Sequence, residues 1–334
     1  MLAADNDLDG LFSAVILDMS LYKIFELEVE TQFREELRWE IPIQDDYDIL
    51  IMLDLAYDNT PNYRKASSRA SQKAFAIDHH VTNESGFPQK VIAYNPCRNG
   101  ECYEPTVFLV DRVAKKLGQE SSDLSEYLAL LGVLADAGIN FRVQNKEIDY
   151  FYDSTIENLY RNGIRSYSFL FKSVEYKGFI YPKFKETIEA LNAEASDVGW
   201  KELYLRFINE TSDLRSAQKF IKRIENKYEG NYTEILDLIP TEPTQVSKSG
   251  IWVVRNTTQI GNGVLGRSIA ELLNRACIVY SCKKTCKISA RGPPESDINF
   301  IPLFSSYGGG HPRACGALVT PKKFQSFLEN ILSS

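Results

Sequence analysis

The chain has 334 residues, of which 44% are hydrophobic, 12% aromatic and 25% charged. This composition is that of a folded globular protein and excludes the disordered class, and the length favours two domains. The formal net charge is −7, which argues against a protein that coats long nucleic acid through its overall field. Such binding depends on many Lys and Arg contacts to phosphates.

The cysteines are few, and nothing in the sequence resembles a signal peptide. No apolar stretch approaches the ~20 residues of a membrane span. We therefore expect reduced thiols, a cytoplasmic location and no membrane partner. Cys282 and Cys286 are four residues apart, but no second Cys or His pair follows at zinc-finger spacing, so a zinc site is not expected there. The six cysteines are Cys97, Cys102, Cys277, Cys282, Cys286 and Cys315.

The first part of the chain alternates short apolar runs with helical patterns, which is typical of a mostly parallel α/β sheet. The runs at 47–56 and 74–80 predict buried strands, each with an acid near its end. Helical periodicity over 11–25 and 126–141 predicts two helices. Ligands bind outside the carboxyl ends of the strands in such sheets, so the residues just past each run are the candidate site.

The segment DNDLDG at 5–10 places Asp5, Asp7 and Asp9 at alternate positions, before a glycine and a helix. In extended backbone, residues two apart share a face, so we expect the three carboxylates to converge on one centre. Four residues precede the cluster, which indicates either a shortened first strand or a beginning that this sequence lacks. An EF-hand loop also begins with this spacing, but Ile16 stands where that loop requires a glutamate.

Acids and imidazoles follow the other predicted elements as well. Asp54 ends the first apolar run, the acid and two histidines of AIDHHV at 76–81 end the second, and Asp136 lies near the end of the helix at 126–141. Mixed carboxylate and imidazole ligands suit Mn, Fe, Zn or Mg, and a bridging carboxylate holds two metals roughly 3.5 to 4 Å apart to activate water against a phosphoryl group. Each acid alone is as well explained by a cap or a turn, but together they predict a metal centre.

The middle of the chain, from about 141 to 237, is charged and rich in aromatic residues. Its patterns at 155–164 and 217–230 predict helices and carry no functional motif. The segment 238–250 is rich in Pro, Thr and Ser and is interpreted as a linker. A second α/β pattern follows, with strands at 251–256, 276–281 and 285–292 and helices at 264–274 and 322–333.

Two motifs near the C-terminus, CKISARG (286–292) and YGGGHPRACG (307–316), predict an anion-binding site. Three consecutive glycines can adopt positive φ and bring backbone N–H groups close to an anion, while His and Arg supply charge-assisted donors. The glycine-rich segment 260–266 lacks the Lys-Ser/Thr of a P-loop, so it is interpreted as the turn into a helix. The candidate substrate-binding residues are Arg291, Gly308, Gly309, Gly310, His311 and Arg313.

In this order the motifs resemble those of the DHH phosphoesterase superfamily. DNDLDG stands for its first motif, Asp54 in LDLA for the second, DHH at 78–80 for the third and Asp136 in GVLADAG for the fourth, and the two C-terminal motifs stand for the associated C-terminal domain. The resemblance covers roughly 1–140 and 250–330. It implies a two-domain α/β fold, with a parallel-sheet DHH catalytic domain (1–140) and a smaller C-terminal substrate-binding domain (251–334). Between them, the sequence pattern predicts a helical region completing or extending the catalytic domain (141–237) and the linker (238–250).

The resemblance also implies residue roles. The cofactor would be two Mn²⁺ ions, with Mg²⁺ or Co²⁺ as alternatives, and Asp54 would bridge them. Asp78 would orient an imidazole, and His80 would face the substrate phosphate. Many relatives carry a His four residues before the first ligand Asp; Ala3 stands there in this sequence, and Asp5 is the candidate replacement. The implied metal ligands are Asp7, Asp9, Asp54, His79 and Asp136.

The activity expected from this combination is a manganese-dependent exonuclease that releases mononucleotides from short single-stranded RNA or DNA. Two alternatives stay open. One is a hydrolase of linear or cyclic dinucleotides or of 3'-phosphoadenosine phosphate. The other, motivated by Ala3, is a catalytically weak scaffold in a replication or repair complex. The expected partners are a short nucleic acid or nucleotide substrate and either a second copy of the chain or a repair or replication protein.

Overall fold

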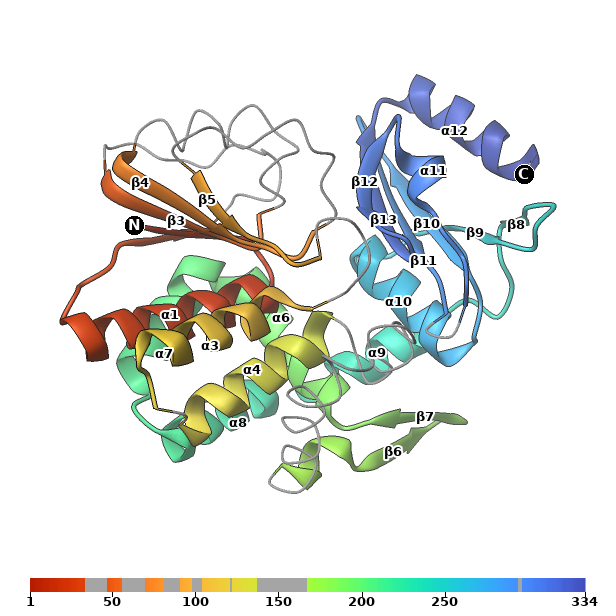
Figure 1. Ribbon diagram of the computed structural model, residues 1–334. Helices are drawn as coiled ribbons and strands as arrows, with labels where there is room; N and C mark the ends of the chain where they lie inside the picture. The colour runs from red at the N-terminus through yellow and green to blue at the C-terminus, as the bar shows by residue number, and fades with distance from the viewer. Residues whose placement is uncertain are drawn as a thin grey trace. The chain divides into compact units, whose positions relative to one another are not determined.

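The computed structural model describes residues 1–33, 47–55, 70–80, 91–97, 104–120, 122–136, 167–293 and 296–333 (Figure 1). The chain divides into two compact units, unit 1 (1–172 and 182–229) and unit 2 (173–181 and 230–334). A parallel sheet in the first unit and a mixed sheet in the second confirm the predicted two-domain α/β class. The helix predicted at 155–164 lies outside the described residues.

Unit 1 is built on a five-stranded sheet in the order β2-β1-β3-β4-β5, and every pairing in it is parallel. The short strand β1 lies between β2 and β3, with Leu2 opposite Thr31 and Ile51. The residues before the acid cluster therefore do form a strand. The strands are β1 (Leu2–Ala4), β2 (Thr31–Phe33), β3 (Tyr47–Leu53), β4 (Ala70–Ile77) and β5 (Val91–Tyr94).

Helices pack against one face of this sheet, where α1 and α3 run beneath the strands in Figure 1. Helix α1 is the central one: it contacts α3, α4 and α7, and all of its first ten residues are buried. Each large apolar side chain buried there contributes about 1.5–3 kcal/mol. The helices of unit 1 are α1 (Leu8–Phe25), α3 (Thr106–Leu117), α4 (Asp123–Asp136), α6 (Phe184–Val198), α7 (Trp200–Glu210) and α8 (Leu214–Lys227). None of the helices described in either unit is long and apolar enough to span a bilayer.

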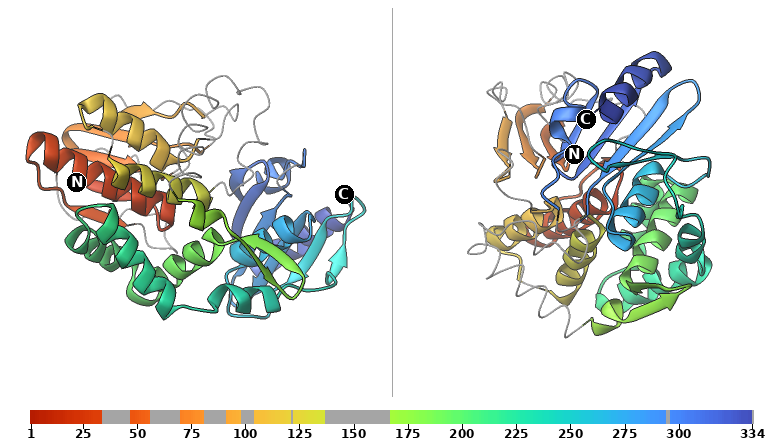
Figure 2. Two further views of the ribbon diagram at one scale, coloured as in Figure 1. Left: turned by 90° about the horizontal axis from the view of Figure 1, so that it is seen from below. Right: turned by 90° about the vertical axis from the view of Figure 1, so that its right-hand side faces the viewer.

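The helices α6, α7 and α8 belong to the same core as the sheet. Phe207 of α7 lies between Phe12 of α1 and Phe220 of α8, with ring centroids 6.0 and 5.2 Å apart. Their edge-to-face geometry is the favourable one for aromatic pairs. In the left-hand view of Figure 2 these helices lie alongside α1. The segment 182–229 is thus packed into unit 1.

Unit 2 contains a six-stranded sheet in the order β12-β13-β11-β10-β9-β8, in which only β9 and β10 pair in parallel. Helix α10 (Asn262–Leu272) covers one face over β10 and β11. Short α11 (Ile301–Phe304) and α12 (Pro321–Ser333) bring phenylalanines to the other face. The strands are β8 (Gln245–Val246), β9 (Trp252–Arg255), β10 (Cys277–Cys282), β11 (Cys286–Arg291), β12 (Gly308–His311) and β13 (Ala314–Val319).

The boundary between the units differs from the predicted one. The segment 238–250, predicted as the linker, lies inside unit 2, where Gln245–Val246 pairs with β9 as the edge strand. Two further elements add apolar side chains to the α10 side of unit 2. One is helix α9 (Asn231–Asp237), and the other is the hairpin of β6 (Ser173–Tyr176) and β7 (Phe179–Pro182). The hairpin follows the short 3-10 turn Ser168–Phe171. Helical spacing in a sequence indicates an apolar face but not the sheet against which it packs.

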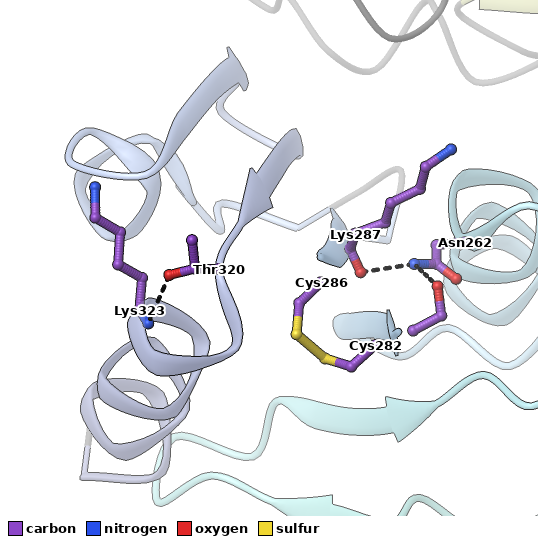
Figure 3. The surroundings of a disulfide bond; sticks show 7 residues. Asn262, Cys282, Cys286, Lys287, Thr320 and Lys323 are labelled. Carbon is purple, nitrogen blue, oxygen red and sulfur yellow. Dashed lines mark hydrogen bonds between the residues drawn. A yellow bond between two sulfur atoms is a disulfide. The ribbon is translucent and has the colours of Figure 1, made fainter. Parts of the chain in front are cut away.

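A disulfide joins Cys282 at the end of β10 to Cys286 at the start of β11 (Figure 3). The two residues are directly opposite in the antiparallel register, and their Cα atoms are 4.1 Å apart. The expectation of reduced thiols is therefore wrong for this pair, because the hairpin turn brings the two side chains together. Cys277 and Cys315 are free thiols and are buried.

Candidate metal centre

The predicted site residues of unit 1 gather at the carboxyl edge of the parallel sheet. Strands β1, β3 and β4 are adjacent and run in the same direction, so their last residues meet at one edge. Asp5, Asp54 and Asp78 each come directly after one of these strands. The position is the one at which open α/β sheets bind ligands.

The acid cluster reaches this edge by a different backbone from the predicted one. Asp7 is the N-cap of α1, and its Oδ1 accepts the Gly10 backbone N–H at 2.8 Å. The helix therefore begins at Leu8, and Asp9 lies in its first turn instead of in an extended segment with Asp5 and Asp7. A Cβ at Gly10 would come within 2.5 Å of the Asp5 carbonyl oxygen, so a glycine is needed where the turn folds back on the strand end.

His79 is at the centre of the cluster. Its Nε2 lies 3.2 Å from Asp54 Oδ1, 3.8 Å from Asp136 Oδ2 and 3.9 Å from Asp9 Oδ2. Three elements distant in sequence, α1, β3 and α4, thus present carboxylates to one imidazole. Two sets of three residues each bring their donor atoms within 4.8 Å of one another. One set is Asp54, His79 and His80, and the other is Asp9, His79 and Asp136.

The remaining predicted ligands lie beside these two sets. Asp5 and Asp7 belong to neither, but both charges help to raise the pKa of Asp54, after burial as the larger cause. Ala3 is 2% exposed and its side chain packs with Met52 on the sheet face opposite the helix-bearing one. Ala3 can supply no metal ligand. Asp5 lies near enough for its charge to act on Asp54, but it belongs to neither donor set.

The raised pKa values of the clustered acids are those expected of a site that binds a divalent cation. Burial and then the charge of Asp5 raise the pKa of Asp7 to about 6. Burial, followed by neighbouring carboxylates, also raises the pKa values of Asp9 and Asp54 well above the ordinary value. Within the described part of the chain no Lys or Arg forms an ion pair with these three acids. Buried carboxylates that repel one another need a cation, and carboxylate–imidazole donor sets suit Mn²⁺, Fe²⁺, Zn²⁺ and Mg²⁺.

Asp54 has an unusual backbone conformation. Its φ is 62°, in the left-handed region that costs a non-glycine residue about 1–3 kcal/mol. The backbone N–H of Asp54 donates to the Ile77 carbonyl at 3.0 Å, which ties the end of β3 to the end of β4. This turn directs the carboxylate towards His79. Strain that a neighbouring strand maintains in this way is common at functional sites.

Asp78 orients the second histidine. Its Oδ1 accepts the backbone N–H groups of His79 at 2.9 Å and His80 at 3.3 Å, and lies 2.7 Å from His80 Nδ1. Burial alone would lower the pKa of His80, but the charge and hydrogen bond of Asp78 raise it to about 9. Burial alone would likewise raise the pKa of Asp78, and His80 lowers it. Asp78 thus favours the protonated form of His80 in the metal-free protein, and 24% of the His80 side chain is exposed.

Thr106, which carries no motif, is a positioning residue that the sequence analysis missed. It begins α3: its hydroxyl donates to Asp54 Oδ1 at 3.0 Å and its backbone N–H donates to Asp9 Oδ2 at 2.8 Å. The next N–H, of Val107, donates to Asp9 Oδ1 at 2.6 Å. The positive end of α3 thus fixes two carboxylates. The only signal in the sequence is a Thr at the start of a helix, which is equally typical of an ordinary cap.

We expect Thr106→Val to weaken Mn²⁺ binding by about 10- to 100-fold, because groups that orient ligands have effects of this size. The variant keeps the shape and both backbone donors but loses the hydroxyl that holds Asp54. Isothermal titration of the metal-free protein with Mn²⁺ measures the change. Thr106→Ser is the matched control and should bind as the wild type does; equal weakening in both variants would show that packing, not the hydroxyl, matters.

In unit 2 the sheet register brings Arg291 and His311 to one end of the sheet, on either side of Ala314. Arg313 is in the β12–β13 turn, where its carbonyl accepts the Gly292 N–H at 2.9 Å. Gly263 and Gly266 of α10 leave room for Arg291, since Cβ atoms there would lie 3.4 and 3.2 Å from its side chain. The glycine-rich segment 260–266 is indeed the turn into a helix, and it also accommodates this arginine.

The three glycines form strand β12, and only Gly310 has a positive φ, of 141°. Added Cβ atoms would come within 2.0 Å of the Gly316 carbonyl at Gly308 and 2.2 Å of the Ala314 carbonyl at Gly310. Close approach of β12 to β13 therefore explains these two glycines, which the sequence analysis explained by positive φ and access of the backbone to an anion. At Gly309 a Cβ would meet nothing within 4 Å, so its backbone is open.

The structure supports a comparison at the level of the fold. A parallel sheet with acids at its carboxyl edge, followed by a second unit with a mixed sheet, is an arrangement that this chain shares with solved structures, one of them a DHH domain. No family model matches the sequence, and no curated protein matches it. The likeness is to solved structures.

One match is RecJ from Thermus thermophilus in complex with Mn²⁺, with 17% identity and a TM-score of 0.59, over 99% of this chain and 51% of that one. This chain thus spans about half the length of that RecJ. The DHH domain of a member of the S1p family of ribosomal proteins matches with 13% identity, a TM-score of 0.67 and coverages of 99% and 86%. CDC45 from Entamoeba histolytica matches with 10% identity, a TM-score of 0.54 and coverages of 99% and 94%.

Proposed function

We propose that this protein is a manganese-dependent phosphodiesterase, an exonuclease that releases mononucleotides from the ends of short single-stranded RNA or DNA. The observation that carries the proposal is the convergence of three buried or half-buried carboxylates on His79 Nε2, at 3.2 to 3.9 Å, from three separate elements. The exonuclease RecJ, which has the same fold, is seen with manganese in another matched structure.

Five residues would hold two metal ions, and the resemblance assigns the ligand shared by both ions to Asp54, whose Oδ1 lies 3.2 Å from His79 Nε2. Bound ions of this kind lower the pKa of a water molecule and neutralise phosphoryl charge. The protein keeps the carboxylates in place through Thr106 and the start of α3. The five proposed ligands are Asp7, Asp9, Asp54, His79 and Asp136.

Asp78 and His80 would act on the substrate. The side chain of His80, which Asp78 orients through Nδ1, would donate a hydrogen bond to a phosphate oxygen or a proton to the leaving oxygen. In unit 2, Arg291, Arg313 and the open backbone at Gly309 would bind the terminal phosphate through charge-assisted hydrogen bonds.

A digestion series tests the proposal. RNA and DNA oligomers of several short lengths, each labelled at either end, are incubated with the protein and Mn²⁺ or a chelator. We expect mononucleotides to appear one at a time and only with metal, and the label lost first gives the direction. His79→Ala should remove the activity; full manganese-dependent activity in that variant would contradict the proposed site.

Other outcomes separate the alternatives. If no oligomer is cleaved but linear or cyclic dinucleotides or 3'-phosphoadenosine phosphate are hydrolysed, the chemistry stands and the substrate is wrong. If nothing is hydrolysed and the protein binds no Mn²⁺, the scaffold hypothesis replaces the enzyme.

A further inference from the structure

We propose that Lys287 binds a second phosphate of the substrate strand, beyond the one that Arg291 would bind, so that oligonucleotides longer than a dinucleotide bind more tightly. The inference rests on the proposed function and concerns unit 2 alone. It extends the binding surface along strand β11 to the hairpin tip, which we define as residues 282–287.

Strand β11 carries a row of polar side chains on one face. Cys286, Ile288 and Ala290 face the phenylalanines of α11 and α12, so the alternate residues Lys287, Ser289 and Arg291 face the α10 side. Alternate residues of a strand repeat about every 6.5–7 Å, which places the Cα atoms of Lys287 and Arg291 roughly 13 Å apart. The row therefore has an exposed cation, Lys287, at one end and the half-buried Arg291 at the other, while Ser289 between them is buried.

On this face α10 contacts β10 and β11, and α9 and the β6–β7 hairpin add apolar side chains to the same side, but side chains of β13 stay exposed. Lys287 is exposed, and its register partner on β13 is Leu318, a leucine with 48% of its surface exposed. Gly316, opposite Ser289, is exposed too. A cation beside an exposed apolar side chain matches the chemistry of a nucleotide, in which an anionic phosphate is linked to a hydrophobic base.

The backbone of Lys287 is held firmly. The side-chain amide of Asn262, at the start of α10, donates to the Lys287 carbonyl at 2.8 Å and to Ser281 Oγ at 3.2 Å. The disulfide of Cys286 closes the hairpin directly before it (Figure 3). Figure 3 shows the Lys287 side chain leaving the strand on the side away from this disulfide. A lysine on a fixed strand loses less entropy on binding than one on a mobile loop.

The hairpin tip carries positive charge. The sequence CKKTCK puts three lysines into six residues of a chain whose net charge is −7. Lys283, Lys284 and Lys287 are all exposed, and among the described residues no acidic side chain forms an ion pair with Lys287. A short positive track of this kind binds a phosphodiester backbone without preference for sequence.

The test is oligonucleotide binding by fluorescence anisotropy with the full chain, in a chelator so that nothing is cleaved. We compare a labelled octanucleotide and a labelled dinucleotide at several salt concentrations. Lys287→Gln should weaken binding of the octanucleotide by about threefold to tenfold and reduce the slope of log affinity against log salt by about 1. Binding of the dinucleotide should change by less than about twofold.

Lys248→Gln is the matched control, because Lys248 is an exposed lysine in the β8–β9 turn, at the opposite end of the same sheet. The inference is overturned if Lys287→Gln binds the octanucleotide as the wild type does, if the dinucleotide is weakened equally, or if Lys248→Gln has the same effect. When the wild type cleaves oligomers but shows one of these results, only the role of Lys287 fails. A wild type that binds no oligonucleotide contradicts the proposed function itself.

Discussion

Asp54→Asn should reduce manganese-dependent hydrolysis by at least about a thousandfold, since a bridging carboxylate is required to hold both ions and their effect amounts to several kcal/mol. The same variant should be more stable than the wild type when both are metal-free at pH 7, by about 1–3 kcal/mol. The reason is that Asp54 is 2% exposed, and burial and neighbouring acids raise its pKa, so its charge is unfavourable in the folded protein. Asparagine keeps an oxygen that can accept from Thr106.

The two effects are measured separately, by initial rates on the substrate found in the digestion series and by urea unfolding of the chelated protein. Asp48→Asn is the control, because Asp48 lies on the same strand but is exposed and bonded to Ser71; it should change neither quantity. A loss of activity accompanied by a loss of metal-free stability would mean that Asp54 has a structural role, and would count against the metal centre.

The second large effect is a pH dependence of stability. Because the pKa of Asp7 is raised to about 6 in the folded protein, against an ordinary value near 3.8, the folded state binds this proton more tightly than the unfolded state does. Protonation of Asp7 therefore favours folding. This contribution is fully present below pH 4 and is lost as the pH rises through about 6, by at most about 2–3 kcal/mol.

Asp7→Asn tests this contribution, because asparagine is also a good N-cap. Removing the charge of Asp7 also lowers the pKa of Asp54, which that charge helps to raise, and this second effect likewise favours the variant at high pH. In chelator, the unfolding free energies of the variant and the wild type should be nearly equal at pH 4, and the variant should be the more stable by pH 7.5. A difference that does not change with pH would contradict the raised pKa. Adding Mn²⁺ should reverse the order at pH 7.5, since a bound cation stabilises ionised ligands.

The grouping of the acids and histidines at one sheet edge could be predicted from the order of residues. Acids and histidines directly after apolar runs are visible in the printed chain, and strand ends in a parallel sheet share one edge, so the order of residues alone was enough to group Asp54, Asp78 and His79. Local rules also identified the α10 turn and the helix that contains Asp136, because capping, glycine and periodicity act over a few residues.

The contacts that position these side chains could not be predicted from the sequence and are seen only in the tertiary structure. Thr106 contacts Asp54 and Asp9 across 52 and 97 residues of chain, and the Cys282–Cys286 pair and the Lys287–Leu318 neighbours arise from strand register. The segment 230–250 likewise packs against the apolar side chains of unit 2 and not against those of unit 1. Contacts of this kind depend on which elements become neighbours, and that is set by burial of whole faces rather than by the residues next to each position in the chain.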